Sequence, residues 1–85
     1  MKTFTYTIQD KVGIHARPAA VLVQEARKFA AELKINVNGE SADLKRIFAL
    51  MTLGIKQGME VTVTAEGADE DVAAAAMKKC LEDNL

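Results

Sequence analysis

The sequence predicts an α+β fold, a two-layer open-faced sandwich in which three helices cover one face of a four-stranded antiparallel sheet. Apolar residues alternate with polar ones in four segments and recur every three to four residues in three others. The order is β-α-β-β-α-β-α. Threonines fill many outward strand positions, which is typical of antiparallel sheets with one solvated face. The length of 85 residues predicts a single domain over residues 1–85.

A strand and a helix are expected first. Phe4, Tyr6 and Ile8 alternate with threonines, which predicts a strand with one buried face. Residues 9–13 are turn-like, and helical spacing begins at about Pro18. Four residues form the apolar face of this helix: Ala19, Leu22, Val23 and Ala26.

A hairpin is expected in the middle of the chain. Alternation resumes over 33–37, and residues 40–43 form a short return strand. Asn38 and Gly39, between them, are the pair that most favours a two-residue turn, because both central residues must accept positive φ.

The second half predicts a helix, a strand and a helix. Residues 44–53 have helical spacing and end at Gly54, a suitable residue for a helix C-terminus. Residues 60–66 alternate as a strand, and Asp69 is suited to cap the last helix. The apolar face of that helix has six members: Val72, Ala73, Ala76, Met77, Cys80 and Leu81. Cys80 is expected to be a small buried side chain.

Composition excludes several functions. Eleven basic and 12 acidic residues give a net charge of −1, which argues against a nucleic-acid binder. No apolar segment is long enough for membrane insertion, and no signal peptide is visible. The single cysteine excludes an internal disulfide, and with one histidine it leaves no metal-binding pattern. We expect a monomeric cytoplasmic protein without a metal or cofactor.

The sole histidine, His15, lies in the segment 13–20, GIHARPAA, where the first helix starts. Proline suits the first helical turn, and neither Ala16 nor Arg17 is a good N-cap. The N–H groups at this helix end therefore favour a bound anion, and Arg17 adds a forked cation suited to phosphate. Taken alone, these residues leave two interpretations open: His15 belongs to a phosphate-handling site, or it is a surface histidine without function.

The segment 13–20 resembles the active-site signature of HPr, the histidine phosphocarrier family of the bacterial phosphoenolpyruvate:sugar phosphotransferase system. The element order, the hairpin, the 44–54 segment and the alanine-rich last helix extend the resemblance over essentially the whole chain. It implies that His15 accepts a phosphoryl group on Nδ1 from phosphorylated enzyme I and passes it to a histidine of an enzyme IIA domain. The protein would be a covalent carrier rather than an enzyme. Arg17, with the backbone of Ala16 and Arg17, would stabilise the phosphoryl group.

A second candidate surface is the 44–53 segment, which is apolar on nearly every face. A short helix cannot bury all of its apolar residues, so we expect Leu50 and Leu53 to face inward and other residues to be partly exposed. In the HPr family the matching helix contacts enzyme I and enzyme IIA domains. The candidate partner-binding residues are Ala20, Lys45, Arg46, Ile47, Phe48 and Met51. For Lys11, Arg27 and Lys45 two interpretations stay open, a basic rim around His15 that steers acidic partners and ordinary solvated charges.

The chain departs from the family at Arg46. Many HPr proteins of Gram-positive bacteria carry a regulatory serine there, which HPr kinase/phosphorylase modifies. Arginine has no hydroxyl and is a poor N-cap, so Asp43 is expected to cap the following helix. The residues leave open a regulatory or nitrogen-related paralogue, in which His15 phosphorylation serves signalling. An RNA- or small-ligand-binding domain is disfavoured because exposed aromatic residues and a basic surface are lacking.

Overall fold

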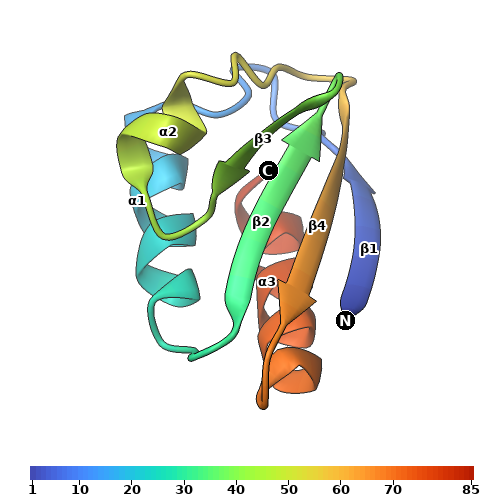
Figure 1. Cartoon of the computed structure of the whole chain (residues 1–85). Coiled ribbons are helices and arrows are strands. Elements are labelled where there is room, and N and C mark those ends of the chain that lie inside the picture. The colour runs from blue at the N-terminus through green and yellow to red at the C-terminus, as the bar shows by residue number, and fades with distance from the viewer.

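The computed structural model describes residues 1–85 and contains one sheet and three helices (Figure 1). The strands are β1 (Lys2–Thr7), β2 (Glu32–Val37), β3 (Glu40–Asp43) and β4 (Glu60–Glu66). The helices are α1 (Ala16–Ala26), α2 (Ile47–Met51) and α3 (Glu70–Asn84). The predicted order of strands and helices is confirmed, and so is the α+β fold class.

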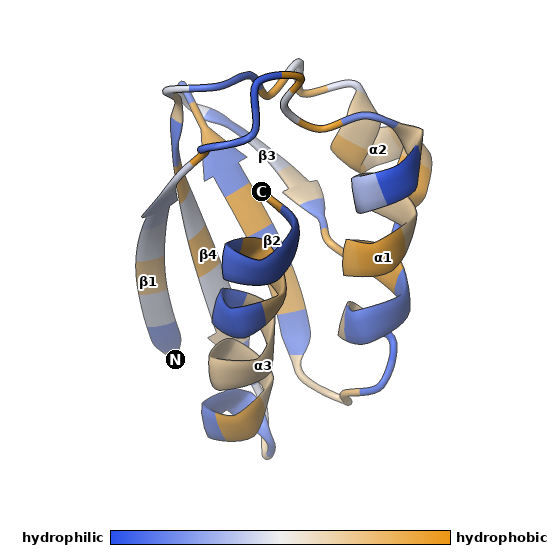
Figure 2. Cartoon of the chain, turned by 180° about the vertical axis from the view of Figure 1, so that it is seen from behind, coloured by the Kyte–Doolittle hydropathy of each residue, from blue (hydrophilic) through white to orange (hydrophobic).

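The sheet has the strand order β1-β4-β2-β3, and every neighbouring pair is antiparallel. Seen from behind, α1 and α3 lie side by side across one face (Figure 2). The short helix α2 packs beside α1 at the β3 edge. The opposite face carries half-exposed threonines such as Thr62 and Thr64, because successive side chains of a strand point to opposite sides.

The core lies between the sheet and the pair α1 and α3. Leu22 and Ala26 of α1 and Met77 of α3 are fully buried against inward residues of the sheet, including Ile35 and Val63. No polar or charged side chain is buried. The expected apolar face of α1 is confirmed in full. None of the three helices has the length and hydrophobicity needed to span a bilayer.

The hairpin between β2 and β3 is confirmed. Asn38 has φ 51° and Gly39 has φ 81°, so both turn residues take the positive φ that this tight turn requires. The turn sets the register that pairs Val37 with Glu40 and Ile35 with Ala42.

The helix α1 begins earlier than expected. Its first residue is Ala16 rather than about Pro18, and His15 is the N-cap. Pro18 is tolerated as the third helical residue because the N–H groups of the first turn have no intrahelical partner anyway. Because the helix starts two residues earlier, His15 is the N-cap of α1 rather than a residue of the preceding loop.

The helix α2 is shorter than predicted, over Ile47–Met51 instead of residues 44–53. Leu44 is pulled into the core as the chain leaves β3, and its N–H donates to the carbonyl of Leu33 at 2.9 Å. Leu44 and Lys45 form a turn after β3, so the helix begins only at Ile47. The helical spacing therefore included one core residue that belongs to the sheet layer.

Two further expectations are wrong. Asp43 does not cap α2: its Oδ1 accepts from the Lys45 N–H at 2.8 Å and closes a turn, while Arg46 occupies the N-cap. Val72 is 59% exposed and lies off the buried face of α3. The buried face is instead formed by Ala73, Met77, Cys80 and Leu81.

Candidate functional site

His15 forms the N-terminal end of α1. Its backbone is extended, with φ −131° and ψ −171°, and its side chain is exposed and does not cap the helix. The first i→i−4 hydrogen bond runs from the Ala19 N–H to the His15 carbonyl at 3.0 Å. The N–H groups of Ala16 and Arg17 precede this bond, and Pro18 has no N–H. Two backbone donors thus lie next to an exposed imidazole, at the positive end of the helix dipole.

A shallow depression of about 200 Å³ brings His15 together with residues from three parts of the chain. Arg17 and Pro18 come from the first turn of α1, Asp10 from the preceding loop and Asn84 from the last turn of α3. Arg17 is exposed and forms no ion pair within the chain, so its guanidinium is available to an external anion. Sequence reasoning missed both Asp10 and Asn84; Asn84 reaches His15 only through the packing of α3 against α1, whereas Asp10 lies in the same loop as His15.

The loop that leads to His15 is held by hydrogen bonds from its own backbone N–H groups. The N–H of Val12 donates to Oδ1 of Asp10 at 2.8 Å, and the N–H of Gly13 donates to the Asp10 carbonyl at 3.1 Å. The N–H of Ile14 donates to the carbonyl of Ile55 at 3.0 Å. These hydrogen bonds fix the backbone of residues 12–14, and they therefore fix the backbone position from which the His15 imidazole projects.

Gly13 is required at its position in this loop. Its φ is 79°, a conformation that costs other residues steric strain, and the residue is buried. A Cβ built there would lie 2.7 Å from Cα of Lys56 and in still closer contact with the carbonyl oxygen of Ile55. The glycine therefore allows the His15 loop to pack directly on the segment after α2.

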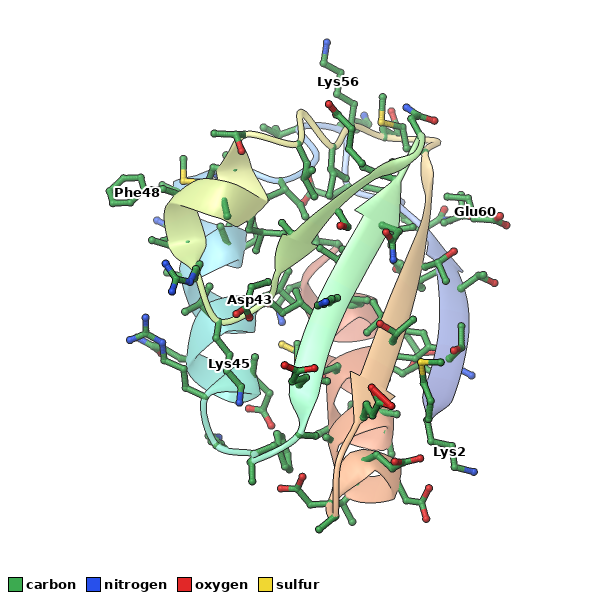
Figure 3. All side chains as sticks on the ribbon, viewed as in Figure 1. Lys2, Asp43, Lys45, Phe48, Lys56 and Glu60 are labelled. Carbon is green, nitrogen blue, oxygen red and sulfur yellow. The ribbon has the colours of Figure 1, made fainter.

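The apolar surface expected at α2 is confirmed. Phe48 is 80% exposed and points away from the body of the molecule (Figure 3), and Met51 is 38% exposed. Ile47 is half-buried, and Leu50 is completely buried as the inward anchor of the helix. Phe48 and Ile47 line a second depression of about 360 Å³ together with Arg27, Arg46 and Ala49.

Of the two interpretations of Lys11, Arg27 and Lys45, the basic rim around His15 does not form. Arg27 follows the last residue of α1 and Lys45 follows β3, so both lie at the end of α1 opposite His15. Arg27 donates through Nε and Nη2 to the Lys45 carbonyl, at 3.1 and 3.0 Å. The Lys45 Nζ donates to the Phe29 carbonyl at 2.8 Å. Only Lys11 of the three precedes His15 in its loop.

No cluster of three histidine, cysteine, aspartate or glutamate side chains lies together in the chain. The expectation that Cys80 is buried is confirmed, and burial raises the pKa of its thiol. Asn84 Nδ2 donates to the Cys80 carbonyl at 2.8 Å, which secures the last turn of α3 near the His15 depression.

Comparison with known proteins identifies the class. Residues 2–83 match the family described as the PTS HPr component phosphorylation site, so the fold and the family together define a phosphocarrier. The chain belongs to the HPr family. The phosphocarrier protein HPr of Mycoplasma genitalium is 51% identical over 85 residues, covering 99% of this chain and 97% of the relative.

Solved structures agree with this assignment. A histidine-containing phosphocarrier protein from Mycoplasma superposes with a TM-score of 0.94 at 44% identity, over 96% of this chain and 93% of the other. An HPr from Thermoanaerobacter tengcongensis gives a TM-score of 0.93 at 39% identity, over 99% and 94%.

Proposed function

We propose that this chain accepts a phosphoryl group from phosphorylated enzyme I on Nδ1 of His15 and passes it to a histidine of an enzyme IIA domain during sugar uptake. The observation that carries the proposal is the position of His15, exposed at the N-cap of α1 beside two N–H donors and the unpaired Arg17 guanidinium. In the transfer, the lone pair of a neutral Nδ1 attacks phosphorus as the bond to the donor breaks. The chain takes part as the phosphoryl acceptor in one transfer and as the donor in the next, each catalysed by its partner, so it is a carrier rather than an enzyme.

Charge stabilisation at this helix end suits a reversible transfer. The phosphoryl oxygens would accept from the N–H groups of Ala16 and Arg17 and from the Arg17 guanidinium. Each exposed interaction of an anion with a helix end contributes about 0.3–1 kcal/mol. The sum is modest, so the phosphoryl group is held against loss but remains transferable to the next histidine.

The proposed partner-docking surface includes the exposed Phe48 and Met51 of α2. The half-buried Ile47 of α2 and Ala20 of α1 also belong to it, and Arg46 and Lys45 lie at its edge. Exposed apolar residues bordered by cations fit partners that are apolar at the contact and acidic around it. Since every residue of the site comes from one chain, a monomer suffices, and we place it in the cytoplasm with enzyme I.

Incubation with phosphoenolpyruvate, Mg²⁺ and enzyme I tests the proposal. The wild-type chain should gain one acid-labile phosphoryl group, detected by intact mass, and should lose it when an enzyme IIA domain is added. His15→Ala should gain none, while Lys11→Ala, in the same loop, should still be phosphorylated. Phosphorylation of His15→Ala by enzyme I would overturn the assignment.

A further inference from the structure

Every polar group of Lys45 has a partner within the chain. Its N–H donates to Oδ1 of Asp43 at 2.8 Å, and its carbonyl accepts both donors of Arg27, at 3.1 and 3.0 Å. Its Nζ donates to the carbonyl of Phe29 at 2.8 Å in a partly buried contact. The side chain runs from the β3 end toward the α1–β2 turn (Figure 3). Lys45 is thus bonded in two directions to the segment that ends α1.

Arg27 and Lys45 therefore form a reciprocal clasp. Arg27 directly follows the last residue of α1 and holds the carbonyl of Lys45, one residue before the N-cap of α2. In the other direction, the ammonium group of Lys45 donates to the carbonyl of Phe29, which follows α1. Only a guanidinium offers two parallel donors to one carbonyl, so the Arg27 half of the clasp has a fixed geometry.

The helix α2 needs such external support. It has five residues, its N-cap Arg46 makes no side-chain cap hydrogen bond, and only Leu50 is buried. Helices this short are unstable alone, because the cost of the first turn is not recovered by further bonds. Packing on α1 and β3 supplies part of the support. The Arg27–Lys45 clasp fixes the one end of α2 that lacks a cap.

We propose that Arg27 and Lys45 are positioning residues that hold α2, and with it Phe48 and Met51, at a fixed place relative to His15. This role rests on the proposed function, in which α2 is a docking surface. The helix α1 carries His15 at one end and Arg27 at the other, and its 11 residues span about 16 Å at 1.5 Å per residue. A partner anchored on a clasped α2 would therefore find His15 at a set distance.

Hydrogen exchange separates positioning from direct contact with a partner, because it is measured on the free chain. The reporters are the N–H groups of Leu50 and Thr52, which donate to the carbonyls of Arg46 and Phe48. Arg27→Met keeps the aliphatic stem but loses both donors, and it should speed exchange at both reporters about tenfold, as loss of about one hydrogen bond would. Val63, in the central strand β4, should keep its rate.

Lys28→Met is the matched control. Lys28 is the next residue, it is exposed, and its ammonium pairs with Glu25 at 3.0 Å within the same helical region. The Lys28→Met substitution removes one positive charge, as Arg27→Met does, but leaves the clasp intact. Hydrogen exchange at Leu50 and Thr52 should therefore not change. Lys45→Met should reproduce the Arg27→Met result. Unchanged exchange at Leu50 and Thr52 in both Arg27→Met and Lys45→Met would overturn the clasp.

Phosphotransfer then tests the consequence for docking. Arg27→Met should raise KM for transfer from phosphorylated enzyme I about fivefold to tenfold with kcat unchanged, because only placement of α2 is impaired. Arg27→Lys, which retains the charge but not the fork, should recover only part of the loss. Phosphorylation of His15 by phosphoramidate, a small donor that needs no docking, should be unaffected.

The two proposals fail in different ways. A wild-type chain that enzyme I cannot phosphorylate overturns the carrier function, whatever the exchange rates show. A wild-type chain that is phosphorylated, with full recovery of KM in Arg27→Lys and unchanged α2 exchange in Arg27→Met, overturns the positioning role. That result would assign Arg27 to a charge contact with the partner.

Discussion

The carboxylate of Asp69, the N-cap of α3, accepts a hydrogen bond from the backbone N–H of Ala31, 38 residues earlier in the chain, at 2.8 Å. Its second oxygen accepts from the N–H of Ala30, also at 2.8 Å. Asp69 does not cap its own helix with its side chain. It ties the start of α3 to the turn between α1 and β2, the same turn whose Phe29 carbonyl binds Lys45.

Replacing Asp69 by asparagine should lower Tm and reduce the acid sensitivity of the fold. The backbone N–H of Ala30, with smaller help from that of Ala31, holds the pKa of Asp69 below its usual value, against an opposing effect of desolvation. A lowered pKa stabilises the fold fully above the unfolded value of about 3.9, and this stabilisation is lost as pH falls through the folded pKa. Tm measured from pH 7 to pH 2 should therefore fall less steeply in Asp69→Asn.

Asp71→Asn is the control, since Asp71 is exposed and meets only Lys2, at 3.4 Å. It should leave Tm at pH 7 nearly unchanged. Glu70, whose pKa is also lowered, mainly by its hydrogen bond with the N-terminal amine, should keep some acid sensitivity in both variants. An Asp69→Asn variant as stable as Asp71→Asn would contradict a structural role for the carboxylate.

Arg17→Ala should slow phosphotransfer without destabilising the chain. Arg17 is exposed and has no ion-pair partner, so its removal should change the free energy of unfolding by no more than about 0.5 kcal/mol. Rates of His15 phosphorylation and of transfer onward should be compared with those of Lys11→Ala, which also removes one positive charge near His15. Equal rates for both variants in both directions would show that the guanidinium has no specific role.

Phe48→Ala should weaken binding to enzyme I while leaving the fold intact. Phe48 is 80% exposed, and truncating an exposed apolar anchor at an interface costs about 1–2 kcal/mol of binding free energy. Calorimetric titration measures the loss. Val72→Ala, an exposed apolar truncation on α3, is the control and should bind as the wild type does. Identical affinities for the two variants would remove Phe48 from the docking surface.

Gly13→Ala should destabilise the chain by more than about 2 kcal/mol, because a positive φ is strained for alanine and the new Cβ meets the backbone of Ile55 and Lys56. Gly39→Ala has a similar φ of 81° but open space around the Cβ, so it isolates the strain alone. Urea denaturation of the two variants gives the difference. Equal losses would mean that the loop moves aside at Gly13.

HPr kinase/phosphorylase with ATP should not phosphorylate this chain. The residue after Lys45 is Arg46, which has no hydroxyl and carries a charge opposite to that of a phosphoserine. Arg46→Ser restores the hydroxyl and should be tested beside the wild type by intact mass. ATP-dependent phosphorylation of the wild type at any serine or threonine, with slower transfer to His15, would show a switch at another position.

The periodic parts of the fold were predictable, because their apolar residues report directly on one buried face. Alternation located β1 and β4, and the Asn38-Gly39 pair located the hairpin. The ends of α1 and α2 were not predictable from periodicity. At α2 a tertiary contact decided the start, because Leu44 is buried in the core instead of beginning the helix. The segment around His15 could be singled out from the sequence, because its histidine, arginine and proline lie together at a predicted helix start.

The parts of the site that lie far apart in the sequence were hidden. Nothing in the local pattern places Asn84 beside His15, because the packing of α3 on α1 does so. Likewise, Arg27 and Lys45 resembled solvated charges beside His15 until their hydrogen bonds to backbone carbonyls were seen. Side chains that bond to distant backbone leave no periodic signal in a sequence.

The position of β4 between β1 and β2 has a consequence for how the chain acquires its structure. The strand β1 pairs only with β4. Phe4 therefore pairs with Val63, and most of the chain lies between these two residues in the sequence. During synthesis, β1 has no hydrogen-bonding neighbour in the sheet until β4, the last strand, has been made. Pairings between such distant segments make folding slower than in helical bundles of this size. The domain should therefore fold in a single late step that needs β4, rather than progressively from β1 onward.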